Sequence, residues 1–168
     1  LSLIKQIIKA ENLDQAIYVP KFIQNKIDQW KNKALNPQDI KTDSLDSMTD
    51  DKSHKIYQIY QKRLFEINCL DFGDLLLQCI NLFTNVDIIK RYSSNFKYIL
   101  VDEYQDTNAA QYIWLKKLAS THNNICCVGD DDQSIYSWRG AEVDNMIRFE
   151  KDFDNASTIR LEQNYRST

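Results

Sequence analysis

The sequence has 168 residues, 43% of them hydrophobic, which is enough for one domain, or one and a half, with a buried core. The formal net charge is −3, the mean hydropathy is −0.52, and the lack of a long apolar run argues against a membrane-spanning protein. No signal peptide is visible, so we expect a cytoplasmic location. The four cysteines form no CxxC pair and the two histidines have no ligand spacing, so no zinc site is expected.

The first part of the chain, residues 1–95, is predicted to be mostly helical. Apolar residues recur there at helical spacing in separate stripes, which we assign to the core. Pro20 is expected in the first turn of a helix, Asp71 is expected to cap a later one, and the polar residues 36–51 are expected to form a loop. The stripes are Leu1, Ile4, Ile7 and Ile8; Phe22, Ile23, Ile27 and Trp30; Ile56, Tyr60, Leu64 and Ile67; and Leu75, Leu76, Cys79, Ile80 and Phe83.

From about residue 97 the pattern changes to strand, helix, strand, helix, strand. Short apolar runs at 98–101, 125–128 and 158–161 are typical of buried strands in a parallel sheet. The intervening segments are long enough for crossover helices. The residues with a specific expectation here are Asp106 or Thr107 as a helix N-cap, Ile113, Leu115 and Leu118 as the apolar face of that helix, and Cys126 and Cys127 as small buried hydrophobes.

A polar cluster follows each predicted strand. The segments are VDEYQDTN at 101–108, GDDDQSIYSWRGA at 129–141 and EQNYRST at 162–168. In open α/β sheets the ligand crevice lies outside the carboxyl ends of the strands, so these clusters fit a nucleotide-binding sheet. Of the adjacent acids Asp102 and Glu103, one can hold Mg²⁺ and the other can accept a proton from an attacking water. A solvated acidic turn before a helix is the alternative for this pair.

These three segments resemble the second, third and fourth signature motifs of superfamily 1A DNA helicases, the UvrD/Rep/PcrA group. LDFGDLLLQ at 70–78 resembles the DFxDLL element before the Mg²⁺-binding strand of this group, and residues 1–69 resemble its helical insertion domain in general character. The resemblance implies an α/β fold in which a mostly helical insertion domain precedes part of a RecA-like parallel-sheet motor domain. The insertion domain would occupy 1–95, the motor domain 96–161, and the crossover to a second motor domain 162–168.

The resemblance also implies roles at an ATP site. Asp102 would bind the Mg²⁺ of Mg·ATP, Glu103 would be the general base, and Gln133 would touch the γ-phosphate. Arg166 would act as an arginine finger and Tyr165 would stack on the adenine. Further polar residues stay open between a role in this site and a structural one: Gln105 and Asp106 as links to neighbouring elements, with capping an equal alternative for Asp106, and Asp130 and Asp131 as supporting acids or as a charged turn.

The YSWRG segment is the candidate for DNA binding. Tyr136 and Trp138 offer aromatic faces that stack on unpaired bases, and Arg139 can pair with phosphate or with a protein carboxylate. Core packing is the alternative for Trp138. The implied function is an ATP-dependent DNA helicase or translocase that moves 3′ to 5′ on single-stranded DNA in repair or replication. The implied partners are single strands, duplex/single-strand junctions and repair or replication proteins, and the slightly negative net charge neither supports nor excludes them.

The sequence departs from the group because it lacks the phosphate loop GxxxxGK[ST], since none of its three glycines precedes a lysine. The adenine-recognition element before that loop and the motifs of the second motor domain are also absent, and Ser137 stands where glycine is more usual. We therefore interpret the chain as an internal piece of a longer helicase or a truncated product, inactive and marginally stable alone. The alternatives are a non-catalytic module that binds single strands or a partner, and an ATPase that does not act on DNA, against which Tyr136 and Trp138 argue.

Overall fold

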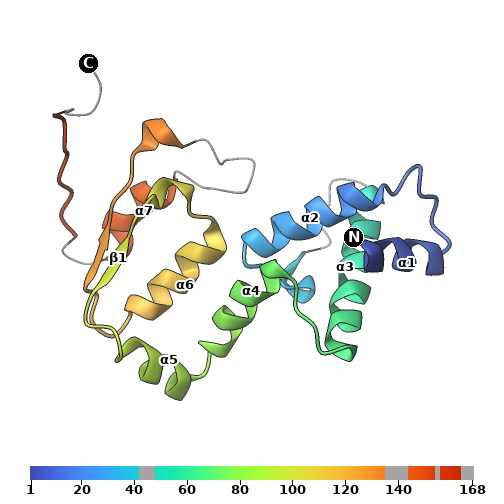
Figure 1. Ribbon diagram of the computed structural model, residues 1–168, viewed down its shortest axis with the longest axis horizontal. Coiled ribbons are helices and arrows are strands. Elements are labelled where there is room, and N and C mark those ends of the chain that lie inside the picture. The colour runs from blue at the N-terminus through green and yellow to red at the C-terminus, as the bar shows by residue number, and fades with distance from the viewer. Residues whose placement is uncertain (42–47, 135–143, 154–155, 164–168) are drawn as a thin grey trace.

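The computed structural model describes residues 1–41, 48–134, 144–153 and 156–163, which are mostly helical with one two-stranded parallel sheet. Figure 1 shows α1, α2 and α3 gathered at one end, β1, α6 and α7 at the other, and α4 between them. The elements are α1 (Ser2–Ala10), α2 (Pro20–Asn32), α3 (Met48–Glu66), α4 (Phe72–Leu82), α5 (Val86–Ser93), β1 (Ile99–Val101), α6 (Ala109–Ala119), β2 (Ile125–Cys127) and α7 (Asp144–Asp152), with the short 3₁₀ helices η1 (Pro37–Asp39), η3 (Tyr104–Asp106) and η4 (Asp131–Gln133).

The helices α1, α2 and α3 form the first packed unit of the chain. Pro20 begins α2, as predicted, at a position where its missing N–H and fixed φ are tolerated. Trp30 of α2 stacks on Tyr57 of α3, with 5.8 Å between the ring centroids and 14° between the ring planes. The core of this unit is Ile4, Ile7, Ile8, Ile23, Ile27, Trp30, Ile40, Ile56 and Tyr57.

A buried ion cluster fixes the DFGD segment against α2. Asp71 caps α4, as predicted, by accepting a hydrogen bond from the backbone N of Asp74 at 2.9 Å. The Nζ of Lys31 lies 2.6 Å from Oδ2 of Asp71 and 2.7 Å from Oδ1 of Asp74, and the side chains of Lys31 and Asp74 are both 0% exposed. Tyr60 and Gln61 of α3 donate to the same two carboxylates at 3.0 and 2.8 Å. This cluster joins α2, α3 and α4.

The ion cluster also explains the largest error in the predicted core. In α4 the inward-facing residues are Asp74, Leu77 and Ile80, because Lys31 holds Asp74 and residues three and six positions further share its face. Five residues assigned to the core are exposed instead: Leu1, Phe22, Ile67, Leu75 and Cys79.

The predicted loop at 36–51 is partly wrong, since η1 lies within it and α3 begins at residue 48.

The parallel strands β1 and β2 pair with Leu100 opposite Cys126 and Val101 opposite Cys127. Alternate residues of a strand point to opposite faces, and one face of this sheet packs against Tyr112 and Leu115 of α6. Leu100 and Cys126 point to the other face, where Leu100 is 81% exposed and Cys126 is also exposed. The predicted burial of Cys126 is therefore wrong, while Cys127 is half-buried. Burial, with Cys126 as a second cause, raises the pKa of the Cys127 thiol to about 12.

The third predicted strand, at 158–161, is wrong. Residues 156–163 form no helix or strand, and the apolar residues Ile159 and Leu161 are 81% and 88% exposed. An extended apolar run becomes a strand only where a neighbouring strand pairs with its backbone, and the described sheet consists of β1 and β2. The α/β prediction is therefore confirmed only for two parallel strands joined through α6, and the rest of the described chain is helical or irregular.

The N-cap of α6 also differs from the prediction. Asn108 accepts a hydrogen bond from the backbone N of Gln111 at 2.9 Å, and the Gln111 side chain accepts one from the backbone N of Asn108 at 2.9 Å. Asp106 lies in η3, and Thr107 ends that turn by donating to the Tyr104 carbonyl at 2.7 Å. The short 3₁₀ turn delays the start of α6, so neither predicted residue is its cap.

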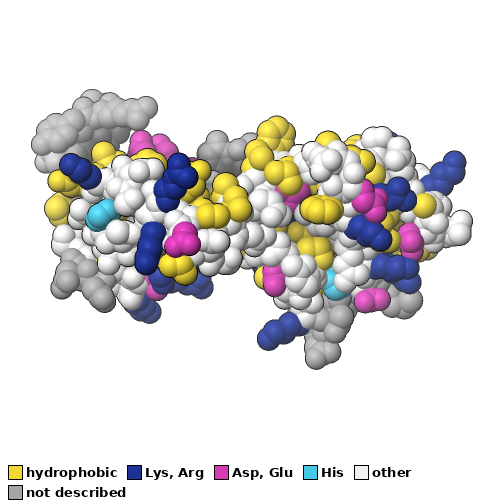
Figure 2. All heavy atoms as spheres, turned by 90° about the horizontal axis from the view of Figure 1, so that it is seen from below, with side chains coloured by type: hydrophobic (Ala, Val, Ile, Leu, Met, Phe, Trp, Pro, Cys, Tyr) yellow, Lys and Arg dark blue, Asp and Glu magenta, His cyan; other side chains and the backbone are white. Residues whose placement is uncertain are grey.

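The surface carries charges of both signs. Figure 2 shows Lys and Arg side chains interspersed with Asp and Glu over the face that it presents, without one continuous basic area. Within the described ranges no single helix is long and apolar enough to cross a membrane. The helices α4 and α5 reach that length and composition only as a pair that is bent by 104°.

Candidate functional site

The carboxyl ends of β1 and β2 meet at one edge of the sheet. The backbone N of Val128 donates to the carbonyl of Val101 at 2.8 Å, and the backbone N of Tyr104 donates back to the carbonyl of Val128 at 2.9 Å. These bonds hold the loop after β1, which carries Asp102 and Glu103, beside the loop after β2. Two of the predicted polar clusters therefore lie together, as the ends of parallel strands require.

Glu103 has an unusual backbone conformation. Its φ is 51° and its ψ is 42°, in the left-handed region that costs a non-glycine residue about 1–2 kcal/mol. The turn is anchored on both sides: the backbone N of Glu103 donates to Oδ1 of Asp102 at 2.9 Å, and Tyr104 is only 3% exposed. The Tyr104 ring packs edge-on against Phe149 of α7 with 5.8 Å between centroids, and burial raises the pKa of its hydroxyl. Four other non-glycine residues of the described chain also have a positive φ, namely Asn12, Ala34, Asn68 and Asn123, so this conformation does not by itself mark a functional site.

Gln105 connects the two loops. It is 1% exposed, its Nε2 donates to Oε2 of Glu103 at 2.7 Å, and its Oε1 accepts from the backbone N of Asp130 at 3.0 Å. A Cβ on Gly129 would lie 2.7 Å from the same Oε1, so the close approach of the second loop requires glycine at that position. Both ends of the buried amide are thus paired, one in each loop.

The hydrogen bonds continue from Asp130 to Gln133. The Nε2 of Gln133 donates to Oδ2 of Asp130 at 2.6 Å, and the backbone N of Asp132 donates to Oδ1 of Asp130 at 3.1 Å. Glu103, Gln105, Asp130 and Gln133 therefore form one continuous hydrogen-bonded chain, which we call the Glu103–Gln133 network. It brings two of the sequence-predicted site residues, the candidate base and the candidate phosphate contact, into one structure.

The remaining predicted site residues are placed differently. Tyr136, Trp138, Arg139, Tyr165 and Arg166 lie outside the described residues, so their predicted roles stay predictions. The carboxylate of Asp106 has a buried Oδ1 without a hydrogen-bond partner. Sequence reasoning missed the left-handed turn at Glu103, and it gave Gln105 as a link to neighbouring elements without identifying its partners, Glu103 and Asp130. The signal for the approach of the second loop to Gln105 was the glycine directly after the 125–128 run, since such glycines mark close backbone approach.

The donor set fits a Mg²⁺ ion that is bound only partly by protein. Among the described residues no three His, Cys, Asp or Glu side chains gather into a metal cage. Mg²⁺ commonly takes one or two carboxylates, keeps several waters and completes its shell with substrate phosphates. Asp102, exposed at the sheet edge, has one oxygen engaged by the Glu103 backbone and suits that arrangement. The loop that would cradle the phosphates, GxxxxGK[ST], is not in this sequence.

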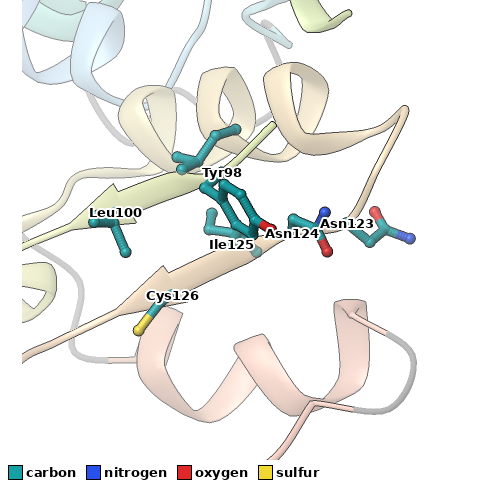
Figure 3. Close-up of a pocket in the computed structure, with 7 residues that line it drawn as sticks. Tyr98, Leu100, Asn123, Asn124, Ile125 and Cys126 are labelled. Atoms are coloured by element: carbon teal, nitrogen blue, oxygen red, sulfur yellow. The ribbon is translucent and has the colours of Figure 1, made fainter. Parts of the chain in front are cut away.

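A hollow of about 260 Å³ lies away from these carboxylates, on the sheet face that α6 does not cover. Figure 3 shows Tyr98, Leu100 and Cys126 along it, with Asn123 and Asn124 at the end where the strands begin. It contains neither Asp102 nor Glu103 and has no charged lining residue. The hollow lacks the groups that phosphate or metal chemistry needs, so the candidate site is the opposite, carboxyl end of the strands.

The comparisons with known proteins agree with the resemblance in the motifs. The model of the UvrD/REP helicase N-terminal domain matches residues 1–154. A probable DNA helicase II homolog of Rickettsia felis is 51% identical over all of this chain and 26% of its own length. DNA helicase II of Rickettsia typhi is 52% identical over the same shares. The ATP-dependent DNA helicase PcrA of Staphylococcus aureus is 46% identical over 99% of this chain and 23% of its own length.

The family match covers most of the chain, whereas the chain spans only about a quarter of the length of these curated relatives. The matched range includes the whole Glu103–Gln133 network and the ion cluster around Lys31. The chain therefore belongs to the UvrD/REP helicase N-terminal domain family.

Proposed function

We propose that the chain is part of an ATP-dependent DNA helicase or translocase that couples hydrolysis of Mg·ATP to movement on single-stranded DNA. The observation that carries this proposal is the Glu103–Gln133 network, which lies at the carboxyl ends of β1 and β2. It links the loop that carries the candidate base to the loop that carries the candidate phosphate contact. The relatives named DNA helicase II and ATP-dependent DNA helicase PcrA support the same activity. The 3′ to 5′ direction follows from the resemblance.

Three described residues would act at the nucleotide. Asp102 would hold Mg²⁺, which neutralises charge on the phosphates when bound. Glu103 would accept the proton of the attacking water, since its carboxylate is exposed at the sheet edge and one of its oxygens is oriented by Gln105. Gln133 would donate its amide to the γ-phosphate, because an uncharged amide can leave Asp130 and return to it. Arg166 and Tyr165 would complete the site as arginine finger and adenine contact.

The DNA contact would be made by the segment after Gln133. Tyr136 and Trp138 would stack on bases and Arg139 would pair with phosphate, each base stack contributing about 1–3 kcal/mol. Single strands and duplex/single-strand junctions would be the substrates, with repair or replication proteins as partners in the cytoplasm.

The domain division belongs to the same proposal. Residues 1–95 would be the C-terminal part of a helical insertion domain, 96–161 part of the motor domain, and 162–168 the start of the crossover. The phosphate cradle would come from sequence outside these 168 residues. The absence of GxxxxGK[ST] from this sequence favours a second candidate function, a catalytically inactive module that binds single strands or a partner protein.

The test compares ATP turnover in the longest polypeptide that carries this segment in its source cell. Glu103→Gln keeps the size of the side chain and removes the base, so we expect DNA-stimulated ATP turnover to fall about 10²–10⁴-fold. Glu66→Gln, at an exposed glutamate at the end of α3, is the matched control and should retain turnover. Equal turnover in the two variants would overturn the catalytic proposal. If this chain is itself the longest polypeptide and binds single strands or a partner protein without hydrolysing ATP, the inactive module is correct.

The DNA contact has its own test. Trp138→Ala should weaken binding to a fluorescent single strand about tenfold or more, because one stacking contact is lost. Tyr98→Ala removes an aromatic ring that is 76% exposed on the uncovered sheet face and serves as the control. A Trp138→Ala protein with unchanged strand affinity and unchanged DNA stimulation of turnover would contradict this assignment.

A further inference from the structure

We propose that Gln105 is a positioning residue, which holds the Glu103 carboxylate in place and transmits the state of Gln133 to it through Asp130. The inference rests on the proposed function, because it assigns a regulator to the same site. Its starting point is geometric: Gln105 is the only member of the Glu103–Gln133 network that is buried, whereas Glu103, Asp130 and Gln133 are exposed. A buried amide between two exposed loops can carry a displacement from one loop to the other.

The orientation of the Gln105 amide is fixed by its partners. The backbone N–H of Asp130 can only donate, so it must face Oε1 of Gln105 at 3.0 Å. The Glu103 carboxylate accepts, so it faces the Nε2 at 2.7 Å. Reversing the amide would leave two buried polar atoms without partners, which costs about 1–3 kcal/mol for each. Gln105 therefore has one arrangement while both loops are in place.

The network couples that arrangement to Gln133. The Nε2 of Gln133 now donates to Oδ2 of Asp130 at 2.6 Å. A phosphate contact would draw that amide away, and Asp130 would lose one of the bonds that fix its loop. The backbone N of the same residue holds Oε1 of Gln105, so a shift of the loop reaches Glu103 through one rigid side chain. Hydrogen bonds in a series polarise one another, which adds an electronic contribution to the mechanical one.

Packing leaves Gln105 little freedom to avoid this shift. A Cβ at position 129 would meet Oε1 of Gln105 at 2.7 Å and its backbone N at 3.2 Å, so the second loop already lies at minimum distance. The adjacent Tyr104 is held between the residue after β2 and α7, by its backbone bond to Val128 and its contact with Phe149. A movement of the second loop is therefore transmitted to Gln105.

Two substitutions distinguish a residue that positions the Glu103 carboxylate from one that only holds the two loops together. Gln105→Met keeps the volume and removes both hydrogen bonds. Gln105→Glu keeps an acceptor for the Asp130 N–H but replaces the donor to Glu103 by a second carboxylate. Thr107→Val is the matched control, since Thr107 is 8% exposed in the same turn and bonds Tyr104 without touching the network.

The experiment measures kcat and KM for ATP, with DNA present, in the longest polypeptide that carries the segment. We expect Gln105→Met and Gln105→Glu each to lower kcat about 10–100-fold, with KM changed less than threefold, because a misplaced base affects the transition state more than binding. Thr107→Val should lower the unfolding midpoint and keep kcat. Wild-type kcat in Gln105→Glu, or an equal loss of kcat in Thr107→Val, would show that Gln105 only holds the two loops together.

A spectroscopic measurement makes the test independent of turnover. With ¹³C-labelled glutamate, the carboxyl resonance that disappears in Glu103→Gln identifies Glu103. At one fixed pH this resonance should shift in Gln105→Met and stay in place in Thr107→Val, and an unshifted resonance in Gln105→Met overturns the inference. Failure of the proposed function is recognised separately, since Glu103→Gln would then retain turnover whatever the Gln105 variants do.

Discussion

The acidic segments DFGD at 71–74 and VDEYQD at 101–106 have opposite structures. In the DFGD segment, Asp71 and Asp74 surround the fully buried Lys31, and Tyr60 and Gln61 bind the same carboxylates. After β1, the adjacent acids remain at the surface, and Glu103 occupies a left-handed conformation. In the first segment both carboxylates pair with one buried cation, whereas in the second one oxygen of each acid accepts a protein hydrogen bond and both side chains stay exposed. The difference teaches that an acidic motif indicates a reactive site where its carboxylates stay exposed and are not paired with a buried cation.

The largest expected effect comes from removing the cation of the ion cluster. Lys31→Met leaves the buried carboxylate of Asp74 and the half-buried carboxylate of Asp71 without their counter-ion, so we expect the free energy of unfolding to fall by about 3–5 kcal/mol. Urea unfolding measures this. Lys33→Met, at an exposed position beside it, should change stability by less than about 0.5 kcal/mol. Similar stability of the two variants would mean that the cluster does not hold the helical unit together.

The same change of glycine to alanine should act differently in the two regions. At Gly129 a Cβ would meet Gln105 Oε1 at 2.7 Å and two backbone nitrogens at 3.2 and 3.3 Å, so Gly129→Ala should lower stability by about 1–3 kcal/mol. At Gly73 the closest atoms are Cδ and Cβ of Lys31 at 2.8 and 3.1 Å, both in one side chain, and alanine regains up to about 1 kcal/mol of helix propensity, so Gly73→Ala should cost less. Thermal unfolding of both variants tests the order, and a Gly129→Ala protein as stable as wild type contradicts the close packing.

The ion cluster also has a defined pH dependence. Burial alone would raise the pKa of Asp71, but the hydrogen bond and charge of Lys31, helped by the Asp74 backbone and Tyr60, lower it below its usual value. A carboxyl whose pKa is depressed in the folded state stabilises the fold at pH above its unfolded value, and that contribution is lost as the pH falls through the folded value. Asp71→Asn should therefore be less stable than wild type at pH 7 and lose less stability on acidification.

Urea unfolding between pH 7 and pH 2 measures this loss for Asp71→Asn. The exposed Asp14 provides the control variant, Asp14→Asn, which should follow the wild-type curve. Parallel curves for Asp71→Asn and wild type would show that the Lys31–Asp71 pair does not contribute to the loss of stability at low pH.

The smallest effect should have the opposite sign. Ala34→Gly relieves a left-handed conformation with φ of 59°, which costs about 1–2 kcal/mol, against about 0.5–1 kcal/mol of added chain entropy, so stability should rise by about 0.5 kcal/mol. Ser120→Gly, at an exposed residue with φ −58°, should lower stability instead. Calorimetry of both variants is decisive, and a loss of stability in Ala34→Gly would show that the backbone at residue 34 is not strained.

Sequence reasoning was most successful where a single local rule decides the structure. Helix spacing predicted the buried face of α1, Pro20 and Asp71 were predicted at their helix starts, and the apolar runs before Asp102 and Gly129 were predicted as parallel strands. It failed where distant contacts decide, because no local pattern shows that Lys31 pairs with Asp71, forty residues along the chain, and holds Asp74 inward as well.

The candidate site shows the same division. The positions of Asp102 and Glu103 at a strand end followed from the sequence, because a polar pair after an apolar run has one natural place in a parallel sheet. The bridge through Gln105 depends on a loop twenty-five residues away, which the sequence alone could not place. The 158–161 run failed for a related reason, since an isolated apolar segment does not reveal whether a partner strand is present.

The most direct measurement of the central claim is the turnover and unfolding midpoint of Glu103→Gln in the same preparation. If Asp102 and Glu103 act in ATP hydrolysis and do not stabilise the fold, ATP turnover should fall at least about a hundredfold while the unfolding midpoint stays at the wild-type value. A variant that unfolds early, as Lys31→Met should, or that hydrolyses ATP at the wild-type rate, would contradict the separation of the two motifs.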